Sequence, residues 1–138
     1  MRLLLDTHVW LWLIGPQDRL SSSALSALAD AENELFLSAA SGFEIALKAA
    51  IGKLRLAGPA SVLVPSYLKR SGVRQLSINV EHALRAGELP MHHRDPFDRL
   101  LVAQAQMEDL VLVTADDQLR AYDVKLLAAG EEAAAEEG

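Results

Sequence analysis

The sequence predicts a single α/β domain over residues 1–128, built on a mostly parallel sheet with helices on both faces. Short apolar segments of strand length alternate with amphipathic segments of helix length, a pattern typical of parallel sheets. The 138 residues, 51 % of them apolar, are enough to bury one hydrophobic core. No run approaches the ~18 apolar residues of a membrane span, and no repeat or linker divides the chain.

In the first half of the chain, each predicted helix has a start or stop signal. Gly15–Pro16 closes the first helix. Ser21–Ser23 supplies a hydroxyl N-cap for the second, and Gly52 stops the third. The predicted elements are a strand at 2–5, a helix at 7–14, a helix capped at 21–23 and running to about 31, a strand at 35–38 and a helix at 39–51. The apolar face of the helix at 39–51 is expected to consist of Phe43, Ala46, Leu47, Ala50 and Ile51.

The second half alternates helices and strands in the same way. Asp95–Pro96 is a helix start signal, with Asp as N-cap and Pro at the first helical position. Pro65 is expected to interrupt or bend the helix that contains it. The predicted elements are a helix at 59–70, a weaker strand at 73–78, a helix at 80–88, a loop at 89–94, a helix from 95–96 to about 109, a strand at 110–114, a short helix at 116–122 and a candidate fifth strand at 124–127.

Four acidic residues stand beside or within apolar segments, where a carboxylate needs an explanation. Asp6 and Asp116 come just past the carboxyl ends of predicted strands. Glu44 lies in the helix that follows the second strand, and Asp98 lies in the first turn of its helix. Burying a carboxylate is unfavourable unless it is paired, hydrogen-bonded or bound to a cation. Because ligands of open α/β sheets bind at the carboxyl ends of the strands, the four can form a hard-oxygen metal site if strands one, two and four are neighbours.

Each acid alone also has a structural explanation. An acid can cap a helix, complement the positive helix N-terminus, or pair with a lysine one turn further on. The case for a site therefore depends on all four acids occurring together in this topology. The structural alternatives are helix caps for Asp6 and Asp116, a pair with Lys48 for Glu44, and interaction with the helix N-terminus for Asp98, with structural roles also expected for the neighbouring Asp95 and Asp117.

The net charge of −6 gives no support to a nucleic-acid partner. Four of the acids lie in the Ala/Glu-rich tail at 129–138, so the rest of the chain carries −2. If cations offset the four acids of the candidate site, the remaining surface is slightly basic, and RNA is not excluded. The tail is expected to be flexible, and no function is assigned to it.

The absence of cysteine excludes disulfides, thiolate metal ligands and a thiol nucleophile. The N-terminal apolar run ends at Asp6, too early for a signal peptide. A cytoplasmic protein without membrane association is therefore expected.

Four blocks of sequence carry a resemblance to a known family. The blocks are Leu4–Trp12 (LLDTHVWLW), Ser41–Lys48 (SGFEIALK) with Gly52–Leu54, His93–Ala105 (HRDPFDRLLVAQA) and Leu112–Asp116 (LVTAD). In this order and spacing they resemble PIN-domain nucleases, specifically the VapC-like toxins of type II toxin–antitoxin systems. The resemblance covers the chain from Arg2 to about Leu127.

The resemblance implies a three-layer fold with the sheet order 3-2-1-4-5, dependence on Mg²⁺ or Mn²⁺, and cleavage of RNA. It also implies an antitoxin that wraps over the toxin, and commonly a toxin homodimer. By position, three residues match the principal acids of the family, namely Asp6, Glu44 and Asp98. Asp116 matches the fourth acid, and Thr7 matches the small hydroxyl residue beside the first.

The chemistry expected of such a site is hydrolysis of an RNA phosphodiester bond. One or two divalent cations can activate water, neutralise the phosphoryl oxygens and assist the leaving oxygen. Asp6 and Asp98 are predicted to be the most direct ligands. Asp116 and Glu44 complete the site directly or through water, and Glu44 is a candidate for orienting the attacking water. Thr7 is a candidate for a hydrogen bond to a carboxylate or phosphate oxygen, whereas a contact of Asp95 with the metal or its water shell is left open.

Several other residues have structural as well as functional explanations. Trp10 and Trp12 lie in the apolar segment 9–14, where they either pack in the core or anchor an antitoxin segment. Candidate phosphate contacts are Lys48, Lys53, Arg55, Arg94 and Arg99. The histidine predictions are a loop location without metal binding for His92 and His93, and structural or exposed positions for His8 and His82.

Three competing protein classes fit less well. A receiver-type signalling domain would have two acids after the first strand, where only Asp6 stands. A haloacid-dehalogenase-type phosphatase needs Asp-x-Asp at the same position, which the sequence Asp6–Thr7–His8 lacks. A PIN-like scaffold that binds RNA or protein without cutting is the remaining alternative, and the intact acids argue against it. An RNA cleavage assay with Mg²⁺, Mn²⁺ and EDTA would separate the scaffold from the enzyme.

Overall fold

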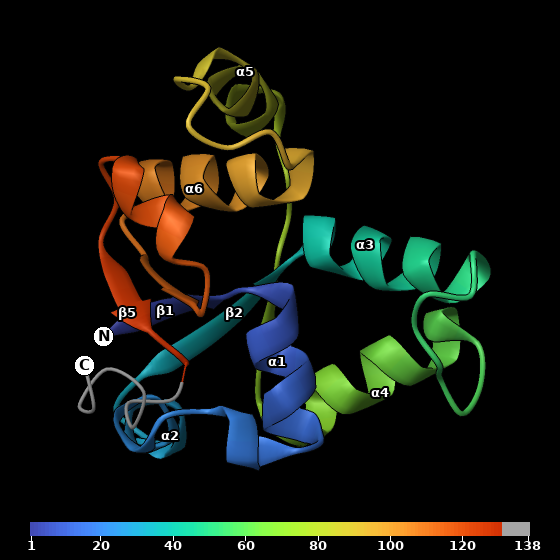
Figure 1. Cartoon of the computed structure of the whole chain (residues 1–138). Helices are drawn as coiled ribbons and strands as arrows, with labels where there is room; N and C mark the ends of the chain where they lie inside the picture. Colours follow the sequence, from blue (N-terminus) through green and yellow to red (C-terminus); the bar gives the residue numbers. More distant parts are fainter. Residues whose placement is uncertain (131–138) are drawn as a thin grey trace.

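The computed structural model describes residues 1–130, which form a five-stranded parallel sheet in the order β3-β2-β1-β4-β5 (Figure 1). The strands are β1 (Arg2–Leu5), β2 (Glu34–Ser38), β3 (Arg74–Leu76), β4 (Val111–Thr114) and β5 (Leu126–Ala128). The predicted fold class and the predicted order 3-2-1-4-5 are therefore confirmed. Because β1 pairs with β2 on one side and β4 on the other, the carboxyl ends of these three strands meet at one edge.

Helices cover both faces of the sheet and so complete three layers. Figure 1 shows α5 and α6 on one side of the sheet and α1, α2 and α4 on the other. Within residues 1–130, no helix is long and apolar enough to cross a membrane. The helices are α1 (Thr7–Ile14), α2 (Ser22–Ala29), α3 (Ala39–Ala50), α4 (Ala60–Ser71), α5 (Val80–Glu88) and α6 (Pro96–Glu108), with the 3₁₀ turns η1 (Gln17–Arg19) and η2 (Asp117–Ala121).

Strand β1 divides the hydrophobic core into two halves. Leu3 and Leu5 are fully buried in the cluster that includes Trp10 of α1. Leu4 points to the opposite face and belongs to the cluster of Leu101 on α6. Successive side chains of a strand face opposite sides of the sheet, and both sides of this sheet are covered. The two halves of the core therefore fix β1 against α1 and α6, which carry residues of the candidate site.

Most predicted boundaries agree with the structure to within two residues. The segment after Asp116 is a 3₁₀ turn instead of the predicted helix, and the turn at Gln17–Arg19 was not predicted. Short 3₁₀ turns leave no apolar periodicity in a sequence, which is why the pattern misses them. Helix α4 continues through Pro65, so the predicted interruption is wrong, whereas a bend at Pro65 stays a prediction.

The predicted apolar face of α3 is wrong. Phe43, Leu47 and Ile51 are 63 %, 40 % and 57 % exposed. In Figure 1, α3 extends beyond the carboxyl end of β2, so most of its length does not cover the sheet. The helix instead turns a mixed polar and apolar face inward, toward α1. The buried residues on that face are Ala40, Ser41, Glu44 and Ile45.

The packed part of the chain extends just past residue 128. Ala129 is buried, its N–H donates to the carbonyl of Thr114, and its carbonyl accepts from the N–H of Ser21. The acidic part of the expected tail, residues 131–138, lies outside the described residues.

Candidate active site

A cleft of about 490 Å³ opens at the carboxyl edge of the sheet. Asp6 follows β1, and Asp116 follows the neighbouring strand β4. Glu44 reaches the same cleft from α3, and Asp98 reaches it from α6. The structure thus brings all four predicted acids to one cleft, while their catalytic role stays a prediction. The remaining lining residues are His8, Trp12, Arg19, Lys48, His93, Asp95 and Ala115.

Asp6 is held on both oxygens at the floor of the cleft. Thr114 Oγ1 donates to Oδ2 at 2.7 Å, and the backbone N–H of His8 donates to Oδ1 at 3.2 Å. Burial raises the pKa of Asp6, and the negative charge of Glu44 adds to this, while the two hydrogen bonds oppose it. Asp6 therefore caps α1, as its structural explanation predicted, and also faces the cleft.

Glu44 is buried in the cleft wall with both oxygens engaged. Thr7 Oγ1 donates to Oε1 at 2.7 Å and lies 2.8 Å from Ser41 Oγ. Lys48 Nζ donates to Oε2 at 2.6 Å, so the pair one helical turn apart is present inside the candidate site. The hydrogen bond to Glu44 raises the pKa of Lys48. Lys48 therefore remains a cation at the edge of the acids, and Thr7 makes the predicted bond to a carboxylate.

Asp98 is the least compensated of the four carboxylates. Burial, the largest cause, and the neighbouring negative charges together raise its pKa to about 7, and only His93 lowers it. A carboxylate in this setting favours the approach of a cation, because a cation stabilises the ionised form. The acids that raise the pKa of Asp98 are Asp6, Asp95 and Asp116.

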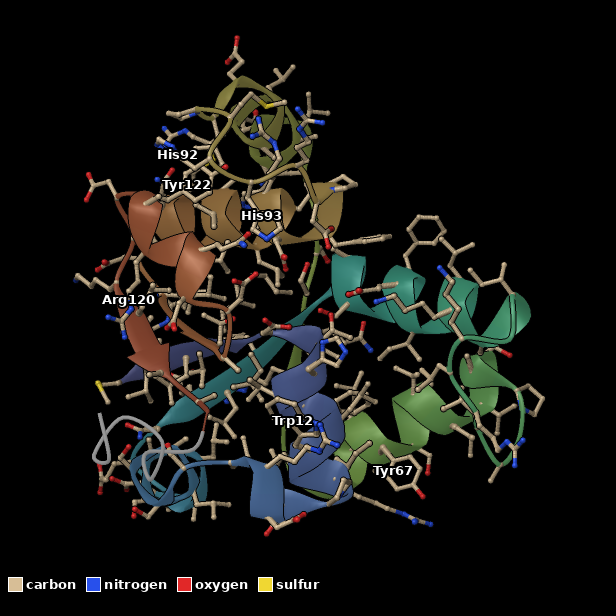
Figure 2. The ribbon with its side chains drawn as sticks, in the orientation of Figure 1. Trp12, Tyr67, His92, His93, Arg120 and Tyr122 are labelled. Atoms are coloured by element: carbon tan, nitrogen blue, oxygen red, sulfur yellow. The ribbon has the colours of Figure 1, made fainter. Side chains whose placement is uncertain are left out.

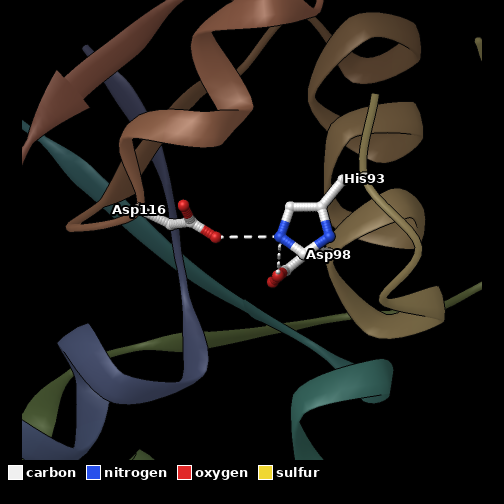
Figure 3. Close-up of side chains that lie close together, drawn as sticks. All are labelled: His93, Asp98 and Asp116. Atoms are coloured by element: carbon white, nitrogen blue, oxygen red, sulfur yellow. Dashed lines mark hydrogen bonds and ion pairs between the residues drawn. The ribbon is translucent and has the colours of Figure 1, made fainter. Parts of the chain in front are cut away.

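His93 lies between two of the acids (Figure 3). Its Nε2 is 2.9 Å from Asp116 Oδ2 and 3.3 Å from Asp98 Oδ2. One ligand-type atom from each of these three residues lies within 4.8 Å of the others. His93 is in the loop before α6, as predicted, but the sequence analysis did not place it beside Asp98 and Asp116. The sequence reasoning therefore missed a residue of the site.

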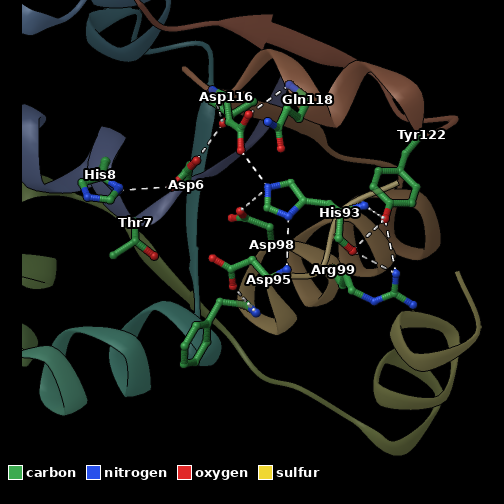
Figure 4. A network of polar contacts seen from close by, with 12 residues as sticks. Asp6, Thr7, His8, His93, Asp95, Asp98, Arg99, Asp116, Gln118 and Tyr122 are labelled. Atoms are coloured by element: carbon green, nitrogen blue, oxygen red, sulfur yellow. Dashed lines mark hydrogen bonds and ion pairs between the residues drawn. The ribbon is translucent and has the colours of Figure 1, made fainter. Parts of the chain in front are cut away.

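The loop that carries His93 is fixed by Arg99 (Figure 4). The buried guanidinium donates to four carbonyls between residues 87 and 93, at 2.9–3.2 Å. Tyr122 Oη donates to the carbonyl of Pro90 at 2.8 Å and accepts from the N–H of His93 at 3.0 Å. Contrary to the prediction of a phosphate contact, the guanidinium of Arg99 is occupied by hydrogen bonds within the protein.

The other candidates separate into residues in the cleft and residues outside it. Asp95 lines the cleft and caps α6 through the N–H of Phe97 at 2.9 Å. Asp117 is 87 % exposed in its side chain and pairs with Arg120, so the structural explanation holds for it. His82 is buried in the cap of α5, which agrees with a structural role. The exposed candidates that do not line the cleft are His92, Lys53, Arg55 and Arg94.

The two tryptophans of α1 have different environments. Trp10 is 1 % exposed, and its Nε1 donates to Ser71 Oγ at 3.3 Å, so its role is core packing. Trp12 is half-buried and lines the acidic cleft. An interface role is therefore wrong for Trp10, whereas it remains a prediction for Trp12.

Two residues with contacts to the acids had weak signals in the sequence. Thr114 is a polar residue at the end of the apolar strand β4, and its hydroxyl also accepts the N–H of Asp116 at 3.1 Å. His93 opens the block that contains Asp98, two positions before the N-cap Asp95. Arg19 reaches the cleft from a 3₁₀ turn and had no signal at all.

The side chains of the cleft fit a hard divalent cation. Asp6, Asp98 and Asp116 offer carboxylate oxygens, which Mg²⁺ and Mn²⁺ prefer. Burial and repulsion from the neighbouring acids raise the pKa of Asp98. The raised pKa indicates that the negative charge of the cleft is not fully balanced by positive groups nearby. A divalent cation would balance that charge.

Fold and cleft together define an α/β protein with a carboxylate-rich site of the metal-binding type at the carboxyl edge of a parallel sheet. The PIN domain family model matches residues 3–125. Ribonuclease VapC22 of Mycobacterium tuberculosis is 38 % identical over 122 residues, which span 86 % of this chain and 90 % of that protein. The chain therefore belongs to the PIN-domain family and, within it, to the VapC branch, as the sequence blocks predicted.

Solved structures of bacterial proteins share the fold. VapBC2 from Rickettsia felis, bound to a promoter DNA fragment, matches with a TM-score of 0.70 at 17 % identity, covering 94 % of this chain and 99 % of that chain. FitAcB from Neisseria gonorrhoeae matches with a TM-score of 0.64 at 22 % identity, covering 91 % and 96 %. At these identities the likeness concerns the fold.

Proposed function

We propose that the chain is a metal-dependent ribonuclease toxin that hydrolyses RNA phosphodiester bonds. The observation that carries this proposal is the convergence of Asp6, Glu44, Asp98 and Asp116 on one cleft. Membership of the VapC branch, with a relative named as a ribonuclease, supports RNA as the substrate.

Asp98 and Asp6 are the proposed direct ligands of Mg²⁺ or Mn²⁺. Asp98 has little hydrogen bonding of its own within the described chain, and each oxygen of Asp6 accepts a single hydrogen bond, which leaves lone pairs free. Asp116 completes the set from the neighbouring strand end. When bound, the cation polarises the phosphoryl oxygen and lowers the pKa of a bound water.

Glu44 is the proposed acceptor for the attacking water. Its two oxygens are fixed by Thr7 and Lys48, so the carboxylate is oriented before substrate binds. Lys48 places a positive charge against Glu44 Oε2, on the side away from Thr7. Lys48 itself carries a charge that can approach a phosphate oxygen.

The proposed partners are an RNA substrate and a cognate antitoxin. The antitoxin follows from the family and from the toxin–antitoxin complexes that share the fold. A homodimer and a cytoplasmic location stay predictions from the sequence.

An RNA cleavage assay on the purified chain tests the proposal. Cleavage should occur with Mn²⁺ or Mg²⁺, stop with EDTA, and fall by at least 100-fold in Asp98→Asn. Asp117→Asn is the matched control, because Asp117 is an exposed acid outside the cleft. The non-catalytic scaffold would instead bind RNA without cutting it under any of these conditions, and that result would overturn the proposal.

A further inference from the structure

Three side chains form a ledge on the wall of the acidic cleft: His8, Trp12 and Arg19. The ring centroids of His8 and Trp12 are 6.1 Å apart, with the planes tilted by 41°. The guanidinium carbon of Arg19 lies over the indole of Trp12, 6.0 Å from its centroid. All three line the same cleft as the four acids. The ledge is therefore continuous with the proposed site of cleavage.

The ledge begins at the first acid of the cleft. The backbone N–H of His8 donates to Asp6 Oδ1 at 3.2 Å, and Trp12 stands one helical turn further along α1. The chain then turns at Gly15 and returns through η1, which ends at Arg19. The next residue, Leu20, is buried and anchors this return. The spacing from the acids to the ledge is thus fixed by a helix and a packed turn.

In the described part of the chain, the polar groups of Arg19 and Trp12 are available to a ligand. Within residues 1–130, Arg19 makes no ion pair, although it lies in a cleft with five acids. The indole N–H of Trp12 also has no hydrogen-bond acceptor in this part of the chain, unlike that of Trp10. A cation without a carboxylate partner, beside a half-buried aromatic ring, is suited to a phosphate and a flat apolar ring.

We propose that this ledge is a nucleotide subsite that holds single-stranded RNA beside the scissile phosphate, an assignment that rests on the proposed ribonuclease function. The base stacks on the indole of Trp12, and Arg19 contacts the base or the adjoining phosphate. Proteins recognise unpaired RNA by stacking bases on aromatic rings and on guanidinium planes. A base held between indole and guanidinium needs roughly 7 to 8 Å between them. The exposed side chain of Arg19 can move outward by that small difference.

Elsewhere in the chain, a second pair of the same kind provides a matched control. The guanidinium carbon of Arg70 lies 5.5 Å from the ring centroid of Tyr67 on α4. This pair lines a different pocket, formed with Leu13, Ile14 and other residues that include none of the four acids. Figure 2 shows Trp12 on α1 and Tyr67 on α4. Any effect of a lost cation–aromatic pair on folding should appear in both places, whereas an effect on RNA should be confined to the ledge.

Tryptophan fluorescence can report base stacking directly, because the chain has only two tryptophans and Trp10 is 1 % exposed. The experiment uses the full chain with Asp98→Asn, so that RNA is not cut, and titrates it with a short single-stranded RNA. We expect RNA to quench the fluorescence, and Trp12→Phe to abolish the quenching. An abasic ribose-phosphate chain of equal length should quench much less.

Affinity measurements complete the test. Trp12→Leu keeps an apolar side chain for packing and should weaken RNA binding by roughly 5- to 150-fold, the effect of losing one stacked base. Arg19 is exposed, so Arg19→Gln should not disturb packing. It should weaken RNA binding and reduce the slope of log K against log salt by about one, the effect of losing one phosphate contact. Tyr67→Leu and Arg70→Gln should leave RNA affinity within about twofold of the parent, because neither residue touches the cleft.

Either of two results would overturn the assignment: equal RNA affinity of Trp12→Leu and its parent, or equal quenching by RNA and by the abasic chain. If Trp12→Leu kept its RNA affinity but no longer bound a co-expressed antitoxin, the ledge would be a binding site for the protein partner instead. Failure of the ribonuclease proposal is distinguishable, because it would appear as no metal-dependent cleavage by the chain with Asp98 intact, while quenching by RNA persisted. In the cleaving chain, ledge variants should raise KM and leave kcat nearly unchanged.

Discussion

His93 Nε2 lies 2.9 Å from Asp116 Oδ2, and the orientation of this imidazole is set from its other side. The backbone N–H of Asp95 donates to His93 Nδ1 at 3.1 Å. Since a backbone N–H can only donate, Nδ1 is an acceptor and the proton of the neutral ring is on Nε2. A nitrogen that carries a proton has no lone pair for a cation. In this arrangement His93 therefore orients the carboxylates and is not itself a ligand.

His93→Ala is expected to weaken Mn²⁺ binding by about 10- to 100-fold, the usual effect of removing a group that orients metal ligands. His93→Gln can still donate a hydrogen bond and should recover part of the loss. Isothermal titration with Mn²⁺ measures this without any reliance on activity. The neighbouring His92→Ala is the control, because His92 packs on Tyr122 and contacts none of the acids. Unchanged Mn²⁺ affinity in His93→Ala would contradict the orienting role.

The pKa of Asp98 predicts how the metal-free protein responds to pH. Its pKa is raised to about 7 in the folded chain, against 3.8 for an ordinary aspartate. The folded state therefore holds this proton more tightly than the unfolded state, and stability falls as pH rises from about 4 to about 7. In EDTA, Asp98→Asn should melt higher than the parent chain above pH 7, because the amide does not ionise.

Melting curves between pH 4 and pH 8, with EDTA or Mn²⁺, check this expectation. Mn²⁺ should raise the melting temperature of the parent chain at pH 8 and have much less effect on Asp98→Asn. An Asp98→Asn chain that melts below its parent in EDTA at pH 8 would show that the carboxylate does not destabilise the metal-free fold.

The sequence could predict the positions of the acids better than the groups around them. Asp6 and Asp116 follow strands, and a parallel sheet brings such positions to one edge whatever the side chains do. The contact of His93 with Asp116 spans 23 residues of chain and depends on the path of a loop, which no periodicity encodes. Arginine is usually a surface residue, yet Arg99 is buried and donates to carbonyls of that same loop.

Helix α3 shows why an apolar pattern alone was misleading. The pattern assigned Phe43 and its apolar neighbours to the core, because isolated helices on a sheet bury their apolar stripe. Here Glu44 is the buried residue, since Thr7 and Lys48 satisfy both of its oxygens. The pair with Lys48 can be read from the helix itself, but the tertiary contact with Thr7 cannot.

Thr114→Val should impair the site without changing its shape. The hydroxyl of Thr114 donates to Asp6 and accepts from the N–H of Asp116, so it links the ends of β1 and β4. Valine has nearly the same volume, but it leaves the buried carboxylate of Asp6 and the partly buried N–H of Asp116 without this partner. We expect a loss of about 1–3 kcal/mol in the free energy of unfolding and weaker Mn²⁺ binding. Thr114→Ser, which keeps the hydroxyl, is the control in denaturant unfolding and metal titration, and equal stability of Thr114→Val and Thr114→Ser would refute the link.

Arg99→Leu should loosen the loop that presents His93 while leaving the sheet folded. The guanidinium supplies the donors for four carbonyls between residues 87 and 93, and leucine supplies none. Losing these four partly buried hydrogen bonds should lower the free energy of unfolding by roughly 3 kcal/mol or more. Hydrogen exchange should therefore accelerate at the N–H of His93 and around it, and much less in β1 and β4. Arg99→Lys keeps the charge but not the planar set of donors and should restore little. If exchange rose equally throughout the sheet, Arg99 would be a general packing residue, and its specific support of the His93 loop would be disproved.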